Sequence, residues 1–433
     1  MVSKPGFFFF SDYGSTMFLA RRLRQQGHPV LLYVKEAAAA KVGTGLVPKT
    51  TNPVPPRGFP FVIFDAVGHG SIGKALRGRG LKVMGANPYD KVLESDRIAG
   101  QQVMSEIGVR TPETHEYRSV GAAITFLEKQ DGAWFVKQIG ADTEEAGTYD
   151  GRTVTDLIRY LRWAGNERLK HFQLSKKADG TEISVNGWFN GRDFVRPFDV
   201  TLEEKKFLAG NLGRRTGCES NLVWLAQDDL LASRTIAPLE AHLGREGYVG
   251  PCDLNSLIDA KGEPIGLEWT ARLGFDATQA WCNLFDSTLG EQLAGFLDGT
   301  LQKWDAAPDL SVTLRVSMPP YPLWEPTVAA KYAGSPVDAA WLRGDQLTVD
   351  DVAMGTDGPQ MAGRDGCIGT VGATGDNVNQ LVVEVLAGAK KLMVPNKQYR
   401  IDPLSRATKD LTALGKLGLV GHPSLARDYG GNE

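Results

Sequence analysis

The sequence contains little of what marks a disulfide-bonded or zinc-binding protein. Among its 433 residues there are only four cysteines and six histidines. The cysteines show no C-x-x-C spacing and the histidines no H-E-x-x-H pattern, so we expect neither a disulfide framework nor a zinc site. We predict reduced thiols in a cytoplasmic protein, and oxygen ligands for any catalytic metal. The cysteines are Cys218, Cys252, Cys282 and Cys367.

Long apolar runs and an excess of one charge are also missing. No run approaches the roughly 20 apolar residues of a membrane-spanning helix, and the opening MVSKPGFFFFSDYG holds no apolar stretch of signal-peptide length. The net charge is −3, which does not favour bulk binding of nucleic acid. The P-loop pattern G-x-x-x-x-G-K-[ST] does not occur. We therefore expect neither a membrane nor a nucleic acid as the main partner.

What is present indicates a globular protein with several domains. Apolar residues make up 42% and charged residues 23%, close to the average of soluble chains. The length exceeds what one hydrophobic core usually serves and favours about two to four domains.

The first segment is predicted as a parallel α/β unit. A buried strand, a turn, a helix and a second strand follow one another, which is typical of parallel sheets. Their ranges are 7–10, 11–15, 17–26 and 30–34. A strand at 61–65, a Gly-rich turn and a strand at 83–85 repeat the pattern. We place the first domain boundary near Asn87-Pro88.

Antiparallel hairpins are predicted farther along. The pattern over 182–200 consists of two strand-like runs joined at Asn190-Gly191, a strong hairpin signal. A second hairpin covers 253–270. Between the first segment and these hairpins, helices are expected at about 90–107 and at 153–163. After about residue 307, separate strands and a helix predict a distinct small α+β module.

Lys137 is the first residue with a possible chemical role. It lies in the strand-like run WFVKQ and precedes a loop that contains Gly140 and Gly147. A lysine beside such a loop can pair with phosphate oxygens while the loop closes over them. The alternative is an edge lysine followed by a solvated acidic loop, and this segment alone leaves both interpretations open.

Asp253 and Glu268 lie on the two strands of the second hairpin. We expect their side chains to oppose each other on one face, about 5 Å apart. Two oxygen ligands at that separation suit magnesium bound to nucleotide phosphates, although ordinary hairpin acids would look the same. Arg272 and Gly274 follow, and a guanidinium there could hold a carboxylate or a transferring phosphoryl group.

Two further features have modest weight alone. The charged cluster over 203–206, EEKK, is more typical of a solvated helix start than of a site. Glycine-rich turns at Gly14 and over 68–73 could receive a phosphate at a helix N-terminus.

Taken in order, these fragments resemble the ATP-grasp superfamily, and more specifically the phosphoribosylamine–glycine ligase family. The similarity runs from the first strand to about Ala407. LESDR (93–97) resembles the family's LE-x-SK, with Arg97 in the lysine's place. FVKQIGADTEEAG resembles VVKADGLAAGKGV, and TEISV (181–185) resembles the GEES-type segment.

Later segments are similar to the family in the same order. EEKKFLAGNLGRRTG is similar to QDHKR-x-x-x-GD-x-G-x-NTGG, and GLEWTARLGFDATQ to LEFNVRFGDPETQ. DGCIGTVGATGDNVNQ and YRIDPLSRA are similar to GGRVLGVTALGDTL and YRKDIGARA. The resemblance implies an ATP-grasp fold of α/β and α+β domains. A parallel pre-ATP-grasp domain covers 1–88, the ATP-grasp domain 89–306 with a lid at about 113–174, and a small α+β domain 307–433.

The resemblance also implies a reaction. Magnesium-ATP phosphorylates a carboxylate, and an amine then displaces phosphate to give an amide. The implied partners are ATP, Mg²⁺ (or Mn²⁺), an amino acid such as glycine and an amine, bound by a monomer or homodimer. Arg272, Lys205 and Lys137 are implied as catalytic residues.

The remaining site residues follow from the same resemblance. The nucleotide is assigned to Arg97, Lys137, Gly140, Gly147, Phe172, Gln173, Leu174 and Glu182, with adenine against 172–174 and Glu182 near the ribose. The metal is assigned to Asp253, Glu268 and Thr270. The substrates are assigned to Gly14, Ser15, His69, Gly70, Arg215, Thr216, Gly217 and Gly274. For His69, an ordinary turn histidine is the alternative.

The sequence differs from the family at the metal ligands, in the lid loop and in the segments that receive the amine. Thr270 stands where the family has an asparagine ligand, and Asp253 could supply the missing oxygen. The lid loop gains Asp142, Glu144 and Glu145 and loses its lysine, which weakens phosphate attraction. The family segments GGREHAL and GPE-x-PL, which receive phosphoribosylamine, are replaced by YGSTMFL and AVGHG. We therefore expect an altered amine acceptor.

Three functions are compatible with this pattern. The first is an ATP-dependent carboxylate–amine ligase. The second is a nucleotide-binding pseudoenzyme, because Arg97, Thr270 and the acidic lid are what a loss of catalysis would leave. The third is a ligase that acts on a modified nucleotide or a polymer.

Overall fold

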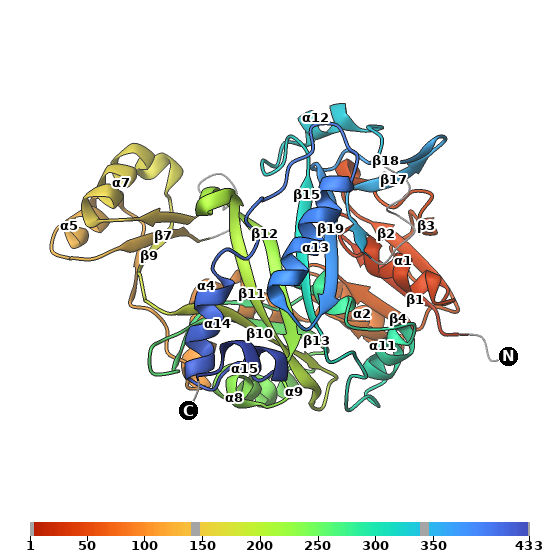
Figure 1. Cartoon of the computed structure of the whole chain (residues 1–433), viewed down its shortest axis with the longest axis horizontal. Helices are drawn as coiled ribbons and strands as arrows, with labels where there is room; N and C mark the ends of the chain where they lie inside the picture. Colours follow the sequence, from red (N-terminus) through yellow and green to blue (C-terminus); the bar gives the residue numbers. More distant parts are fainter. Residues whose placement is uncertain (1–3, 140–147, 338–345, 432–433) are drawn as a thin grey trace.

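The computed structural model describes residues 4–139, 148–337 and 346–431 (Figure 1). Their strands form a five-stranded sheet, a four-stranded sheet, an eight-stranded sheet and the pair β17–β18. No helix within the described residues is long and apolar enough to cross a membrane.

The N-terminal sheet is entirely parallel, with strand order β3-β2-β1-β4-β5. Its strands are β1 (Phe7–Ser11), β2 (Val30–Val34), β3 (Lys49–Thr50), β4 (Phe61–Phe64) and β5 (Lys82–Met84), and its helices include α1 (Met17–Gln25) and α2 (Gly70–Gly78). Alternate phenylalanines of β1 enter two different core clusters, which explains its uninterrupted apolar run. The predicted parallel α/β unit is confirmed.

The four-stranded sheet, which we call the lid sheet, is antiparallel with order β6-β9-β7-β8. It contains β6 (Thr114–Tyr117), β7 (Trp134–Gln138), β8 (Thr148–Gly151) and β9 (Phe172–Lys176), with α5 (Val120–Leu127) and α7 (Val154–Arg168). These elements have their own buried cluster, centred on Trp134, Leu161 and Phe172. Figure 1 shows the lid sheet projecting from the rest of the molecule.

The large sheet has the order β14-β13-β10-β11-β12-β15-β19-β16. Its strands are β10 (Thr181–Phe189), β11 (Phe194–Leu208), β12 (Leu212–Leu225), β13 (Gly250–Ile258), β14 (Pro264–Thr270), β15 (Leu310–Ser317), β16 (Leu347–Val349) and β19 (Cys367–Gly375). Both predicted hairpins are confirmed, because β10 pairs with β11 and β13 with β14, each pair antiparallel.

The C-terminal strands continue this same sheet. β15 pairs with β12, and β19 pairs with β15, so the hydrogen-bond ladder crosses the predicted boundary at 306. The expectation of a distinct C-terminal module is thus corrected at the level of the sheet: its strands complete the edge of β12. The helix α13 (Val378–Lys391) and the pair β17 (Val352–Gly355) and β18 (Gly358–Met361) belong to this segment. The domain boundaries themselves stay predictions.

The remaining helices connect these sheets. They are η1 (Ala37–Ala39), α3 (Pro88–Asp90), η2 (Lys91–Ser95), α4 (Arg97–Glu106), η3 (Ala209–Asn211), α8 (Leu230–Arg234), η4 (Ala237–Leu239), α9 (Glu240–Arg245), α10 (Ala277–Cys282), α11 (Leu289–Leu297), α12 (Pro326–Ala329), η5 (Ala330–Tyr332), α14 (Ala407–Lys416) and α15 (Pro423–Tyr429). The helix predicted at 90–107 is divided at Asp96, whose carboxylate accepts from the amides of Ile98 and Ala99 and so begins α4.

Candidate functional site

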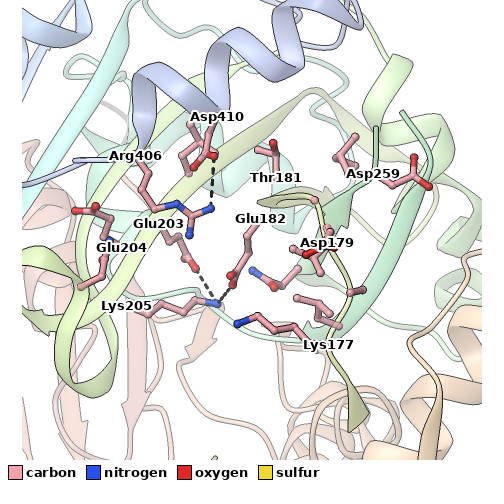
Figure 2. A pocket seen from close by; sticks show the side chains of 18 of the residues that line it. Lys177, Asp179, Thr181, Glu182, Glu203, Glu204, Lys205, Asp259, Arg406 and Asp410 are labelled. Atoms are coloured by element: carbon pink, nitrogen blue, oxygen red, sulfur yellow. Dashed lines mark hydrogen bonds and ion pairs between the residues drawn. The ribbon is translucent and has the colours of Figure 1, made fainter. Parts of the chain in front are cut away.

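A cavity of about 1060 Å³ lies between the lid sheet, the large sheet and helix α14 (Figure 2). Lys137 and Thr148 line it from the lid sheet, Glu182 and Glu268 from the large sheet, and Lys409 from α14. Of the residues assigned from the sequence, the cavity is lined by Lys137, Glu182, Lys205, Arg215, Thr216 and Glu268. Gly140 and Gly147, also assigned there, lie outside the described residues.

Lys205 forms the centre of the charged part of this cavity. Its Nζ lies 3.1 Å from Glu182, 3.3 Å from Glu203 and 3.8 Å from Glu268. Figure 2 shows its side chain pointing between Glu182 and Glu203. Burial opposes its charge, but the three carboxylates outweigh that and raise the pKa of Lys205 well above its ordinary value. Lys205 is therefore a fixed positive charge facing the cavity.

The strand geometry around Lys205 corrects one prediction. The cluster EEKK over 203–206 is part of β11 and not a helix start. Glu203 lies 3.3 Å from Lys205 Nζ, whereas Glu204, which also lines the cavity, lies 3.5 Å from the buried Arg400. A run of charges gives no apolar periodicity, so its sequence could not distinguish strand from helix.

Glu268 and Lys137 both line the cavity, and the charge of each shifts the pKa of the other. The side chain of Glu268 is 50% exposed. The partial loss of hydration opposes its ionisation, but Lys205, Lys137, Arg97 and Arg215 outweigh it and lower the pKa of Glu268 to about 2. Burial lowers the pKa of Lys137 to about 8, with Glu268 acting against this change and the neighbouring cations adding to it. The excess of cations around one carboxylate is an environment suited to a polyphosphate with a metal ion.

The register of the β13–β14 hairpin changes the predicted metal ligands. Asp253 is opposite Thr270, whereas Glu268 is opposite Asn255, so the predicted Asp253–Glu268 pairing is wrong by one pair along the face. Neither Asp253 nor Thr270 lines the cavity. Burial, reinforced by Glu203, raises the pKa of Asp253 well above its ordinary value.

Asn255 fits the ligand role that the sequence assigned to Asp253. It lines the cavity opposite Glu268, and its Nδ2 donates to Ser184 Oγ at 3.1 Å. Its Oδ1 is buried without a hydrogen-bond partner in the described structure. Within the described residues no group of three His, Cys, Asp or Glu side chains could hold a metal. A cation here would thus use Glu268, Asn255 and phosphate oxygens, as magnesium commonly does.

Arg272 does not line the cavity and is held beside it. Its Nε donates to Glu94 Oε1 at 2.9 Å, and the amide of Ala271 donates to Glu94 Oε2 at 2.8 Å. The pairing joins two segments of the family resemblance, LESDR and the stretch around Arg272. Gly274 follows in the same loop, where its carbonyl accepts from the amide and hydroxyl of Thr278.

The predicted adenine contacts are corrected. Phe172 and Leu174 are fully buried in the core of the lid sheet and offer no surface to a ligand. Gln173 is buried as well, and its Nε2 donates to Gln101 of α4 at 3.0 Å. The next residues, 176–180, line the cavity instead, so the contact surface lies just beyond the predicted one. The sequence of one strand does not show which of its two faces packs against the hydrophobic core.

Several assigned substrate residues lie at the carboxyl ends of β1 and β4. There His69 Nε2 lies 2.8 Å from Asp12 Oδ1, and Ser11 and Thr16 contact the buried Asp65. Burial raises the pKa of Asp65 to about 6. Gly14 donates its amide to Ser11 Oγ, and Ser15 follows in the same turn. In open α/β sheets this edge is where ligands usually bind.

Gly70 has a packing role. Together with Gly68 and Gly73 it spells G-x-G-x-x-G after β4, but the spacing serves contacts within the protein. A Cβ on Gly70 would lie 2.7 Å from Pro88 N, and one on Gly73 would lie 2.0 Å from Ala86 O. Close approach of α2 to the β5–α3 connection therefore accounts for both glycines.

Arg215, Thr216 and Gly217 lie on β12, near the tip of the β11–β12 hairpin. Arg215 is exposed and Thr216 donates its hydroxyl to the carbonyl of Lys205 at 3.2 Å. Arg97, the first residue of α4, is half-buried and close enough to lower the pKa of both Lys137 and Glu268. Arg97 and Arg215 thus add to the positive field of the cavity.

Comparisons with known proteins agree with this architecture. No family model matches the sequence. A phosphoribosylamine–glycine ligase of Neisseria meningitidis serogroup B is 23% identical over 351 residues, which cover 77% of this chain and 80% of the relative. The crystal structure of phosphoribosylamine–glycine ligase from Thermotoga maritima superposes with a TM-score of 0.71 and 16% identity, over 92% of this chain and 100% of that one.

A third similarity adds a bound nucleotide. Biotin carboxylase of Campylobacter jejuni, solved as a β-γ-ATP complex, superposes with a TM-score of 0.60 and 12% identity, over 97% of this chain and 96% of that one. The chain has the ATP-grasp fold. Within this fold, the lid sheet and the large sheet enclose the cavity that Lys137, Lys205 and Glu268 line.

Two functional candidates were missed by sequence reasoning. Asn255 has no distinctive sequence context, and only the register opposite Glu268 and its unpartnered oxygen indicate a role. Helix α14 extends beyond the family resemblance and still contributes Lys409 and Asp410 to the cavity wall. The sequence does not give the register of the β13–β14 hairpin, and only that register pairs Asn255 with Glu268.

Proposed function

We propose that this protein is an ATP-dependent ligase that joins a carboxylate to an amine through an acyl phosphate. The observation that carries the proposal is the convergence of Lys137, Lys205 and Glu268 on one cavity between two sheets. The curated relatives are ligases, and a nucleotide complex exists among the structural neighbours. The substrates would be small molecules, namely an amino acid such as glycine and an amine, in a cytoplasmic monomer or homodimer.

The proposed chemistry has two steps. A carboxylate oxygen of the first substrate attacks the γ-phosphorus of ATP, and the bond to the bridging oxygen of ADP breaks. The amine nitrogen then attacks the acyl carbon, the bond from that carbon to the phosphate oxygen breaks, and the nitrogen loses its proton. Positioning and charge neutralisation supply most of the catalysis in such phosphoryl transfers.

Each charged residue has a place in this scheme. Lys137, Arg97 and Arg215 would neutralise phosphate oxygens, and Lys205 would remain charged throughout. Glu268 and Asn255 would hold Mg²⁺ or Mn²⁺, which when bound offsets the negative charge of the phosphates. Arg272 would orient the phosphoryl group of the acyl phosphate.

The amine acceptor differs from phosphoribosylamine in this proposal. The edge of the N-terminal sheet that would receive it presents Asp12, and the buried Asp65 contacts Ser11 and Thr16 there. Lys35, which lies 3.9 Å from Asp12, already pairs with Glu36 at 3.0 Å. Carboxylates repel a phosphate, so an acceptor without a phosphate fits this edge better.

The test is release of ADP that depends on added substrates. Purified protein with magnesium-ATP is screened against amino acids and amines, and ADP and the amide product are measured. Glu268→Ala is expected to lower turnover by about 100-fold or more, because it removes a metal ligand. Glu263→Ala, on the same hairpin and half-exposed beside Arg234, is the matched control and should retain activity.

Two results would contradict the proposal. Nucleotide binding without ADP release under any substrate pair would favour a pseudoenzyme. Undiminished turnover of the Glu268→Ala variant would refute the metal assignment.

A further inference from the structure

The short segment Pro88–Ser95 lies between the two elements that the proposed reaction must align. It comprises α3 and η2, a five-residue π-helical turn of a kind that is often found at functional sites. Asp90 Oδ1 accepts from the amide of Gly68, in the loop of the proposed acceptor edge, at 3.2 Å. Four residues later, Glu94 accepts from Arg272. One helical segment therefore contacts both loops.

Glu94 holds Arg272 at two points. Its Oε1 accepts from Arg272 Nε at 2.9 Å, and its Oε2 accepts from the adjacent amide of Ala271 at 2.8 Å. Because one carboxylate binds both the side chain and the backbone of this loop, it fixes the direction in which the guanidinium of Arg272 points. The two residues are separated by 178 positions, so this is a tertiary contact.

The rest of the guanidinium is arranged to leave one edge open. Arg272 Nη1 donates to the carbonyl of Leu273 at 2.9 Å, and Nη2 has no hydrogen-bond partner in the described part of the chain. The side chain of Arg272 is 32% exposed, whereas that of Glu94 is 19% exposed. Glu94 is thus the inner partner, and the open edge of Arg272 can reach a ligand.

We propose that Glu94 is a positioning residue, which holds Arg272 so that its open edge meets the phosphoryl group of the acyl phosphate. This inference rests on the proposed ligase function. Arg272 is the group that contacts the phosphoryl oxygens, and Glu94 acts only through it. The competing interpretation is that the ion pair merely ties η2 to the large sheet.

The test is a double-mutant cycle on turnover. Glu94→Gln keeps the size of the side chain but replaces one of its two acceptor oxygens with an NH₂ group. That group cannot accept from Arg272 Nε or from the amide of Ala271. We expect kcat to fall about 10- to 100-fold, as for a small misplacement of a reacting group, while the calorimetric Kd for magnesium-ATP changes less than about twofold. In an Arg272→Ala background the same change should cause no further loss.

Asp229→Asn is the matched control. It removes a carboxylate that accepts from Arg196 Nε at 2.9 Å, the same type of contact between two residues that do not line the cavity. Its kcat should equal that of the wild type. If the Glu94→Gln and Arg272→Ala losses multiply, or if Glu94→Gln weakens magnesium-ATP binding and melting temperature without a change in kcat, the positioning role is refuted.

A second measurement does not depend on turnover. Inorganic phosphate is titrated calorimetrically into the protein saturated with magnesium-ADP. Phosphate binding should be lost in Arg272→Ala and weakened about tenfold in Glu94→Gln. Equal phosphate affinity in Glu94→Gln and wild type would overturn the inference. A wild type that binds phosphate but turns over no substrate would overturn only the proposed function.

Discussion

Lys137 is proposed to neutralise phosphate oxygens, but its surroundings in the cavity disfavour its positive charge. It lies on β7 among Arg97, Arg215 and Lys205, and burial together with these cations lowers its pKa to about 8. The protonated fraction is therefore lost as pH rises through about 8, far below the ordinary range of a lysine. Phosphate oxygens at the cavity would favour the protonated form and restore it.

Binding of magnesium-ATP should therefore be linked to proton uptake. Near pH 8 we expect uptake of about half a proton per nucleotide, and an affinity that declines as the pH is raised further. Calorimetric titrations in buffers with different ionisation enthalpies measure the uptake. Lys137→Arg keeps a permanent charge and should abolish this proton uptake. Unchanged uptake in that variant would assign the proton to another group.

At the scale of elements, the position of α2 depends on a contact between backbones. A Cβ at Gly73 would lie 2.0 Å from the carbonyl oxygen of Ala86, whereas at Gly78, also in α2, nothing lies within 4 Å. The helix therefore packs closely on the β5–α3 connection at Gly73, whereas there is open space beside Gly78. The close contact also places the loop of His69, which precedes α2.

Substitutions in α2 should have opposite effects at Gly73 and Gly78. Gly73→Ala is expected to destabilise the protein by about 1–3 kcal/mol, because the helix must move away from Ala86. Gly78→Ala should be neutral or stabilise by up to about 1 kcal/mol, since alanine favours the helix. Chemical denaturation of both variants measures these changes. If both variants lost the same free energy of unfolding, the contact with Ala86 would not be the reason for glycine at position 73.

Across the whole molecule, the lid sheet and the C-terminal strands are integrated in different ways. The lid sheet has its own buried cluster, and its two ends meet where the amide of Lys176 donates to the carbonyl of Glu113 at 2.9 Å. In contrast, β15 carries Leu310, Val312 and Leu314 fully buried in the main core. The C-terminal segment therefore completes the large sheet, whereas the lid sheet is an insertion.

Two shortened chains should behave differently. A chain that ends at residue 306 leaves the edge of β12 unpaired and its core open, so we expect aggregation. A chain in which a short glycine–serine linker replaces 114–175 should stay soluble and cooperative but lose nucleotide binding. Size-exclusion chromatography and thermal unfolding compare the two. A soluble, cooperative 1–306 chain would show that the C-terminal strands are dispensable.

Local sequence patterns determined the strands, hairpins and charged residues of this protein. The family resemblance of the ordered motifs indicated the ATP-grasp fold and proposed Lys137, Lys205 and Glu268 as site residues. The phenylalanine run of β1 and the Asn190-Gly191 turn predicted a buried parallel strand and a hairpin. These predictions succeeded because strand periodicity and turn chemistry act over a few residues.

Only the tertiary structure decided which of these residues meet. Register along β13–β14 put Asn255, not Asp253, opposite Glu268, and packing buried Phe172 inside the lid sheet. Glu94 and Arg272 meet across 178 positions, and β15 completes the large sheet across a predicted boundary. Pairing partners and core-facing sides depend on the whole sheet being assembled, and a period of two residues along one strand does not contain that information.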